Sequence, residues 1–126
     1  MNDLIGLRYG WGHAPWDGSG KTDCFQLACE VHKRLGFADY TEQFEWVYRD
    51  YTDETFPRKL IFRWLLDNGT RIDAPRSGAV AFLPGEAGAA LATVLEDDAV
   101  LFIAPSQNVV RSQIPTGMGA YFWMNR

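Results

Sequence analysis

Cys24 is the side chain in this sequence best placed to act as a nucleophile. It follows Thr22 and Asp23, residue types that cap helix N-termini, and a helical pattern of apolar residues begins with it. Unpaired backbone N–H groups and the positive end of the helix dipole favour a thiolate over a thiol at such a position. The same N–H groups can help to hold an oxyanion. Cys24 is therefore either an activated nucleophile or a buried structural cysteine.

Two histidines are available as a base for such a thiol, and they differ in reach. His32 lies eight residues beyond Cys24, about 12 Å along a helix axis, so it cannot be the base and is expected to be a solvated helix residue. His13 lies in a glycine-rich loop that runs from Gly10 to Gly20. It is either a displaced base for Cys24 or a loop histidine with a local hydrogen bond.

The second cysteine, Cys29, is expected to be a small buried hydrophobe. Five residues place it about 140° from Cys24 around one helix, so the two thiols cannot form a disulfide without breaking that helix. No Cys and His residues have the spacing of a zinc site. We therefore expect two reduced cysteines, no metal and no other cofactor.

The elements that must position these residues are helices in the first half of the chain and strands in the second. Helical character is predicted for 24–36, 40–51 and 57–69, and a short helix or turn for 4–9. Short β-rich segments follow beyond Pro75: 79–83, 91–95, 100–104, 109–114 and 120–123. Residues 96–98, Glu-Asp-Asp, are expected to form the turn of an antiparallel hairpin.

This order of elements predicts an α+β fold in which N-terminal helices pack on a C-terminal antiparallel β-sheet. No internal repeat or linker interrupts the chain, so we expect one domain over residues 1–126. Its length is sufficient for a hydrophobic core without disulfides.

The charge and the hydropathy pattern exclude several classes of protein. The net charge is −4, and no run of Lys and Arg interleaved with aromatic residues is present, so no nucleic acid is expected as a partner. The apolar runs are too short to span a bilayer, and the N-terminus lacks the features of a signal peptide. The expected location during synthesis is therefore the host cytoplasm.

A set of motifs in this chain resembles the NlpC/P60 cysteine-peptidase family. Residues 4–12, Leu-Ile-Gly-Leu-Arg-Tyr-Gly-Trp-Gly, precede Thr-Asp-Cys at 22–24 and Leu-Gly at 35–36. In that family a Tyr-x-Trp-Gly loop precedes an Asp-Cys at a helix start, and a Leu-Gly or similar pair ends the helix. Residues 77–83 are similar to the family strand that follows a Gly-Asp, and 99–110 to its closing hairpin.

The resemblance implies a papain-like fold. It also implies a hydrolase that acts on bacterial cell-wall peptides or related amides. Cys24 would be the nucleophile, and Tyr9 a neighbour that hydrogen-bonds near the thiol. Trp11 and Asp23 would lie on the substrate-binding side. His13 would be a catalytic residue only if the protein is active.

The chain departs from the family pattern where a base and its orienting group are needed. The family histidine opens the strand matched by 91–95, where this chain has Ala90 or Leu91. The third polar group falls on Ile103, and the bulky pair Phe25-Gln26 replaces the small residues after the cysteine. Loss of a base typically costs about 10²–10⁴-fold in rate. Ala90 or Leu91, together with Ile103, is expected to face Cys24 from neighbouring strands and to raise the pKa of the thiol.

Three functions remain open at this stage. The first is a catalytically degenerate NlpC/P60-like domain that acts as a structural or accessory component of a larger assembly, such as a phage tail or virion. Its aromatic and acidic stretch 44–48 would then be either a contact surface or a cap on the core. The second is an active cysteine hydrolase with His13 as the base, and the third is a non-catalytic module that binds peptidoglycan peptide.

Overall fold

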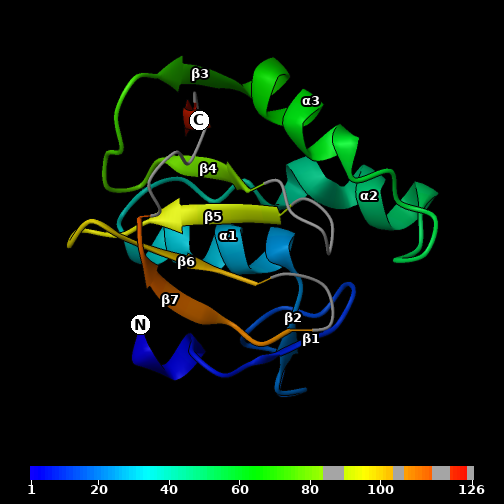
Figure 1. Ribbon diagram of the computed structural model, residues 1–126. Helices are drawn as coiled ribbons and strands as arrows, with labels where there is room; N and C mark the ends of the chain where they lie inside the picture. Colours follow the sequence, from blue (N-terminus) through cyan, green and yellow to red (C-terminus); the bar gives the residue numbers. More distant parts are fainter. Residues whose placement is uncertain (84–89, 104–106, 115–119, 125–126) are drawn as a thin grey trace.

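Helices form in the first half of the chain and strands dominate the second, as a computed structural model shows (Figure 1). The structure describes residues 1–83, 90–103, 107–114 and 120–124. The helical elements are η1 (Asn2–Leu4), α1 (Cys24–Arg34), η2 (Thr41–Phe44), α2 (Glu45–Asp50) and α3 (Lys59–Asn68). The strands are β1 (Arg8–Tyr9), β2 (Lys21–Thr22), β3 (Gly69–Ile72), β4 (Val80–Leu83), β5 (Ala90–Val94), β6 (Ala99–Phe102), β7 (Val110–Gln113) and β8 (Ala120–Met124).

Six strands form one sheet in the order β3-β8-β4-β5-β6-β7, and all its neighbouring pairs are antiparallel. β4, β5 and β6 are consecutive in the chain and form a meander, whereas β8 returns to lie between β3 and β4. In Figure 1, α1 lies behind β5 and β6, and α3 lies next to β3 at the top. The predicted α+β class with helices on an antiparallel sheet is confirmed.

The strands of the six-stranded sheet agree with the predicted segments to within two residues, with one exception. Residue 104, the predicted end of one segment, lies outside the described residues. The exception is β3, which the sequence did not predict. Gly69 was expected only to end a helix, but it also begins this edge strand and pairs with Met124 of β8.

A two-stranded parallel ladder corrects the prediction of a short helix or turn for residues 4–9. The prediction holds for residues 4–6, where η1 ends and a turn follows, and it is wrong for Arg8 and Tyr9, which form β1. β1 pairs with β2, so Tyr9 lies opposite Thr22 and the backbone N–H of Gly10 donates to the Thr22 carbonyl at 3.0 Å. This ladder brings the segment that holds Tyr9 to the beginning of α1.

Both ends of α1 are determined by side chains and glycine at the positions that the sequence indicates. Asp23 is the N-cap and accepts a hydrogen bond from the backbone N–H of Gln26. At the other end Gly36 has φ +92°, the left-handed conformation that commonly follows a helix. The N–H groups of Gly36 and Phe37 donate to the carbonyls of Lys33 and His32, which satisfies two terminal acceptors.

The prediction that His32 is a solvated helix residue is wrong, because its side chain is buried. The chain turns back after Gly36, and the rings of Phe37 and Tyr40 lie 5.1 and 4.7 Å from the imidazole ring. Its Nδ1 lies 2.7 Å from the carbonyl oxygen of Ala38. Helical spacing gives no sign of this burial, because the residues that cover His32 follow the helix and turn back over it.

The core lies between α1 and the sheet, and α2 and α3 extend it. Cys24, Leu27 and Val31 are among the α1 residues that face β5 and β6. In the predicted stretch 44–48, Phe44 and Val47 are buried, so that stretch caps the core. Aromatic side chains supply much of the packing here, because each buries a large apolar area.

Candidate functional site

Cys24 is the first residue of α1, at the position that the sequence predicts, and α1 packs against β5 and β6. Both cysteines are free thiols, as expected from their spacing, and both are buried. The Cys24 side chain is only 1% exposed. The thiol therefore has the helix position of a nucleophile without the solvent access of one.

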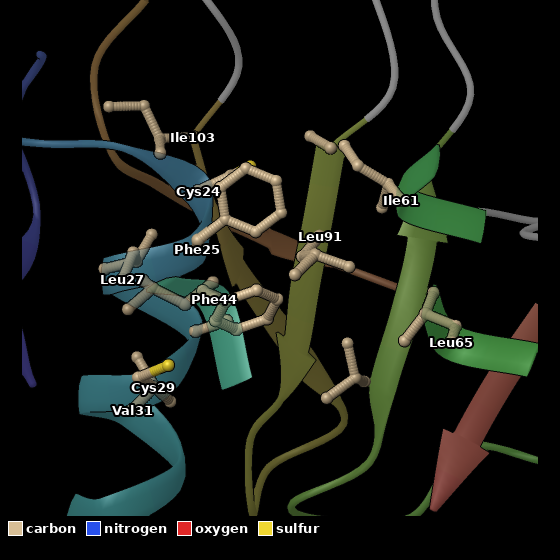
Figure 2. Packing of buried hydrophobic residues seen from close by; sticks show 14 of the residues in the cluster. Cys24, Phe25, Leu27, Cys29, Val31, Phe44, Ile61, Leu65, Leu91 and Ile103 are labelled. Carbon is tan, nitrogen blue, oxygen red and sulfur yellow. The ribbon is translucent and has the colours of Figure 1, made fainter. Parts of the chain in front are cut away.

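Apolar residues from the sheet surround the thiol. Figure 2 shows Ile103 beside the start of α1 and Leu91 of β5 facing the helix, with the ring of Phe25 next to Cys24. Ala90, the first residue of β5, belongs to the same buried cluster and is 2% exposed. The positions where the resemblance expected a histidine and its orienting group are thus occupied by side chains that cannot transfer a proton.

Burial, and after it the charge of the neighbouring Asp23, raise the pKa of Cys24 to about 12. The backbone N–H of Leu91 and the guanidinium of Arg58 act in the opposite direction. Burial likewise raises the pKa of Cys29 to about 12. At neutral pH both groups are thiols, which are poor nucleophiles.

Asp23 organises the entrance to α1 and is itself fully buried. One carboxylate oxygen accepts from the Gln26 N–H at 2.9 Å. The other accepts from the Gly12 N–H at 2.8 Å and from the Tyr48 hydroxyl at 2.7 Å. Burial raises the pKa of Asp23, and these hydrogen bonds oppose that rise. The contacts tie the glycine-rich loop and α2 to the helix start, and a substrate role for Asp23 stays a prediction.

Tyr9 takes part in a hydrogen-bonded cluster close to the thiol. Its hydroxyl donates to Asp53 at 2.8 Å and accepts from Arg58 at 3.1 Å, and Arg58 also contacts Asp53 at 3.0 Å. The second terminal nitrogen of Arg58, Nη1, is buried and has no hydrogen-bond partner among the described residues. Arg58 is the cationic group whose charge acts on Cys24.

His13 lies in the loop that leads to Cys24, but its ring is directed to a neighbour in that loop. Its Nδ1 lies 3.0 Å from a carboxylate oxygen of Asp17, and 44% of its side chain is exposed. Only its backbone carbonyl contacts the helix entrance, where it accepts from the Asp23 N–H at 3.3 Å. The contact between His13 and Asp17 agrees with one of the two interpretations from the sequence, a loop histidine with a local hydrogen bond.

Trp11 belongs to an aromatic cluster over the first turn of α1. Its ring lies 6.4 Å from Phe25, 5.3 Å from Tyr48 and 5.7 Å from Phe56. Phe56 in turn lies 5.5 Å from Phe25. Trp11 therefore helps to close the side of the site that faces α2, and its predicted contact with a substrate stays a prediction.

Three polar residues of this site were not identified from the sequence: Tyr48, Asp53 and Arg58. Their partners, Asp23 and Tyr9, lie between 25 and 49 residues away along the chain. No local pattern links residues at such separations, so no signal in the sequence identified them.

Within the described residues, no group of three or more His, Cys, Asp or Glu side chains could hold a metal ion. In that same part of the chain, no helix has the length and apolar character needed to cross a membrane. No protein-family model matches this chain, and no curated protein or solved structure matches it either.

Proposed function

We propose that this chain is a catalytically degenerate NlpC/P60-like domain with a papain-like fold. It works by contact, as a structural or accessory component of a larger assembly such as a phage tail or virion. The observation that carries this proposal is the state of Cys24. The thiol keeps the helix position of a nucleophile, yet it is buried in the cluster that also contains Leu91 and Ile103, and its pKa is raised to about 12.

The electrostatics favour an inert thiol. A pKa of about 12 in place of 9.0 lowers the thiolate fraction near neutral pH by about three powers of ten. Loss of a general base removes typically a further 10²–10⁴-fold from the rate. A hydrolase needs a thiolate, a proton donor for the leaving group and access for substrate. Cys24 has no histidine in the positions of the family pattern, and His13 is paired with Asp17.

Alkylation of Cys24 tests this proposal. In a Cys29→Ala variant at about pH 8, we expect iodoacetamide to leave the folded protein unmodified while it reacts readily with the urea-unfolded chain. Mass spectrometry follows the modification, and a Cys24→Ala variant measures Cys29 as the matched control. Hydrolysis of cell-wall peptides is expected to be undetectable, and Cys24→Ser is expected to leave assembly unchanged.

If the protein is instead an active cysteine hydrolase with His13 as the base, the opposite results are expected. Rapid alkylation of the folded protein well below pH 8, together with peptide hydrolysis that disappears in His13→Ala, would contradict the proposal. It would show that His13 leaves Asp17 and serves as the base.

A further inference from the structure

Arg8 and Lys21 are two cationic side chains that lie next to each other on the outer face of the β1–β2 ladder. They are register partners in the parallel pair, so their side chains leave the ladder on the same side, from strands about 5 Å apart. Tyr9 and Thr22 point to the other side, where Thr22 is fully buried and Tyr9 is half-buried. Both Arg8 and Lys21 are exposed, so the ladder presents two adjacent positive charges to solvent.

The segment that leads into β7 adds Asn108 to this row. Two backbone hydrogen bonds, of 3.0 and 2.8 Å, hold residues 107–109 beside residues 7–9. Arg8 and Asn108 are opposite each other in an antiparallel bridge of the type in which side chains lie close, and Asn108 is exposed. In Figure 1, β1, β2 and the beginning of β7 lie together at the lower right. Three polar side chains, Lys21, Arg8 and Asn108, therefore form one row across three adjacent strand segments.

No carboxylate of the described residues neutralises the two cations of the row. Neither Arg8 nor Lys21 forms a salt bridge there, although six other cations do: Lys33, Arg34, Arg49, Arg58, Arg63 and Arg111. Acidic residues are not scarce, since the chain has 16 Asp and Glu against 12 Lys and Arg. Like charges directly opposite each other destabilise a pair of strands. An anion bound between Arg8 and Lys21 would remove that repulsion.

Gly10 allows the Lys21 side chain to lie flat against the ladder. A Cβ at Gly10 would lie 2.8 Å from Lys21 Cβ, 2.9 Å from Lys21 Cδ and 3.0 Å from His13 Cδ2. The aliphatic stem of Lys21 thus passes over the Gly10 backbone next to the His13 ring, which leaves it less freedom to lose when its ammonium binds a ligand. The Asp17 carboxylate contacts the His13 ring and two backbone N–H groups of its own loop, and it makes no salt bridge with Lys21.

The donors of the row match a phosphate group with three free oxygens. The Arg8 guanidinium is a planar fork that binds two oxygens of a phosphate, the Lys21 ammonium is a compact point charge, and the Asn108 amide supplies further N–H donors. None of these side chains has a hydrogen bond within the described residues, so all their donors are available. A phosphate monoester offers three such oxygens, whereas a carboxylate or a phosphodiester offers two. The row therefore favours a monoester over either of the other anions.

We propose that Arg8, Lys21 and Asn108 form a binding site for the phosphate group of a phosphate monoester. The net charge of the chain is −4, so the protein as a whole does not attract anions and the row itself must supply the affinity. The site lies on the face of the ladder opposite to Tyr9. It requires no particular state of Cys24, and the inference goes beyond the proposed function.

Titration of the isotope-labelled protein with glycerol phosphate, followed by NMR at constant ionic strength, tests this inference. The backbone amide signals of residues 8, 21 and 108 are expected to shift in a saturable manner, with a dissociation constant in the millimolar range. Dimethyl phosphate, a diester, and acetate are the matched anions, and each is expected to bind at least about 5-fold more weakly because it offers one oxygen fewer. Equal affinity for glycerol phosphate and either of these anions would overturn the inference, as would the absence of saturable shifts.

Substitutions within the row locate the site. Arg8→Gln and Lys21→Gln are each expected to weaken glycerol phosphate binding at least about 5-fold, and Arg8→Lys, which keeps the charge but loses the fork, is expected to weaken it as well. Arg71→Gln, at an exposed cation of β3 without a salt bridge in the described part of the chain, is the matched control and should bind as wild type. Circular dichroism checks the fold, and Asn108→Ala replaces any row variant that fails to fold. Wild-type affinity in the folded row variants would overturn the inference and leave the alkylation behaviour of Cys24 unaffected.

Discussion

Two opposing effects act on Cys24, and their magnitudes decide its state. A helix N-terminus stabilises an anion by about 0.3–1 kcal/mol, which corresponds to less than one pH unit in pKa. Burial and the adjacent Asp23 charge raise the pKa from 9.0 to about 12. Burial therefore outweighs the helix dipole. The helix dipole and the charge of Arg58 together do not offset burial, so Cys24 stays a thiol near neutral pH.

Asp23 is the residue on which the hydrogen bonds of the helix entrance converge, so its removal should destabilise the protein. Asp23→Ala removes the N-cap and leaves the Gly12 N–H and the Tyr48 hydroxyl without their acceptor. We expect the free energy of unfolding to fall by about 2–4 kcal/mol, measured by urea denaturation. Asp50→Ala, at an exposed site, is the matched control and should change it by less than about 0.5 kcal/mol. Equal losses in the two variants would show that the Asp23 contacts contribute nothing specific.

At the scale of elements, the exit of α1 is joined to the beginning of β4. Phe37 follows the glycine that ends the helix, and its ring contacts both His32 and Trp123 of β8. Gly78, just before β4, lies against this ring, and its N–H donates to the Val94 carbonyl at 2.9 Å. The close approach of backbone to ring requires a residue without a side chain.

Gly36 and Gly78 have nearly the same φ but different surroundings. Substitutions at the two positions therefore separate the cost of a left-handed backbone from the cost of steric overlap. Gly36 has φ +92° and open surroundings, whereas Gly78 has φ +90° and an added Cβ would lie 2.3 Å from Phe37 Cε2. Gly36→Ala is expected to cost about 1–2 kcal/mol of unfolding free energy, from the left-handed conformation alone. Gly78→Ala should cost about 2–5 kcal/mol, since overpacking adds to the same strain. Urea denaturation of both variants measures the difference, and equal costs would mean that the Phe37 ring moves away freely.

At the scale of the whole molecule, the stability of the fold is linked to pH through His32. Burial lowers the pKa of His32, so the folded protein binds a proton there less readily than the unfolded chain, whose value is near 6.5. The contribution of neutral His32 to stability is therefore complete above about pH 6.5 and is lost as the pH falls below it.

A non-titrating substitution tests this linkage. His32→Gln keeps an N–H donor for the Ala38 carbonyl but cannot be protonated. Between about pH 7.5 and about pH 5, the urea midpoint is expected to fall less in His32→Gln than in wild type. An unchanged pH dependence in His32→Gln would assign the acid sensitivity to other groups.

The sequence by itself determined the features that depend on neighbours along the chain. An acidic cap before Cys24, apolar residues at helical spacing and Gly36 as a stop were sufficient to locate α1. The order of helices and strands followed from similar short-range signals, and the spacing of Cys24 and Cys29 excluded a disulfide. Such signals work because capping, helical periodicity and turn conformation involve residues within a few positions of one another.

Only the tertiary structure decided which surfaces those elements bury. β8 enters the sheet between β3 and β4, Phe37 and Tyr40 cover His32, and the backbone of Leu91 lies against Cys24. The cluster of Tyr9, Asp53 and Arg58 joins residues up to 49 positions apart. These contacts form because the folded chain buries apolar surface between distant segments and pairs the polar groups that are buried with it. Residue spacing carries no record of that pairing. The position of Cys24 and its apolar neighbours were expected from the sequence, whereas the polar cluster of Tyr9, Asp53 and Arg58 was not.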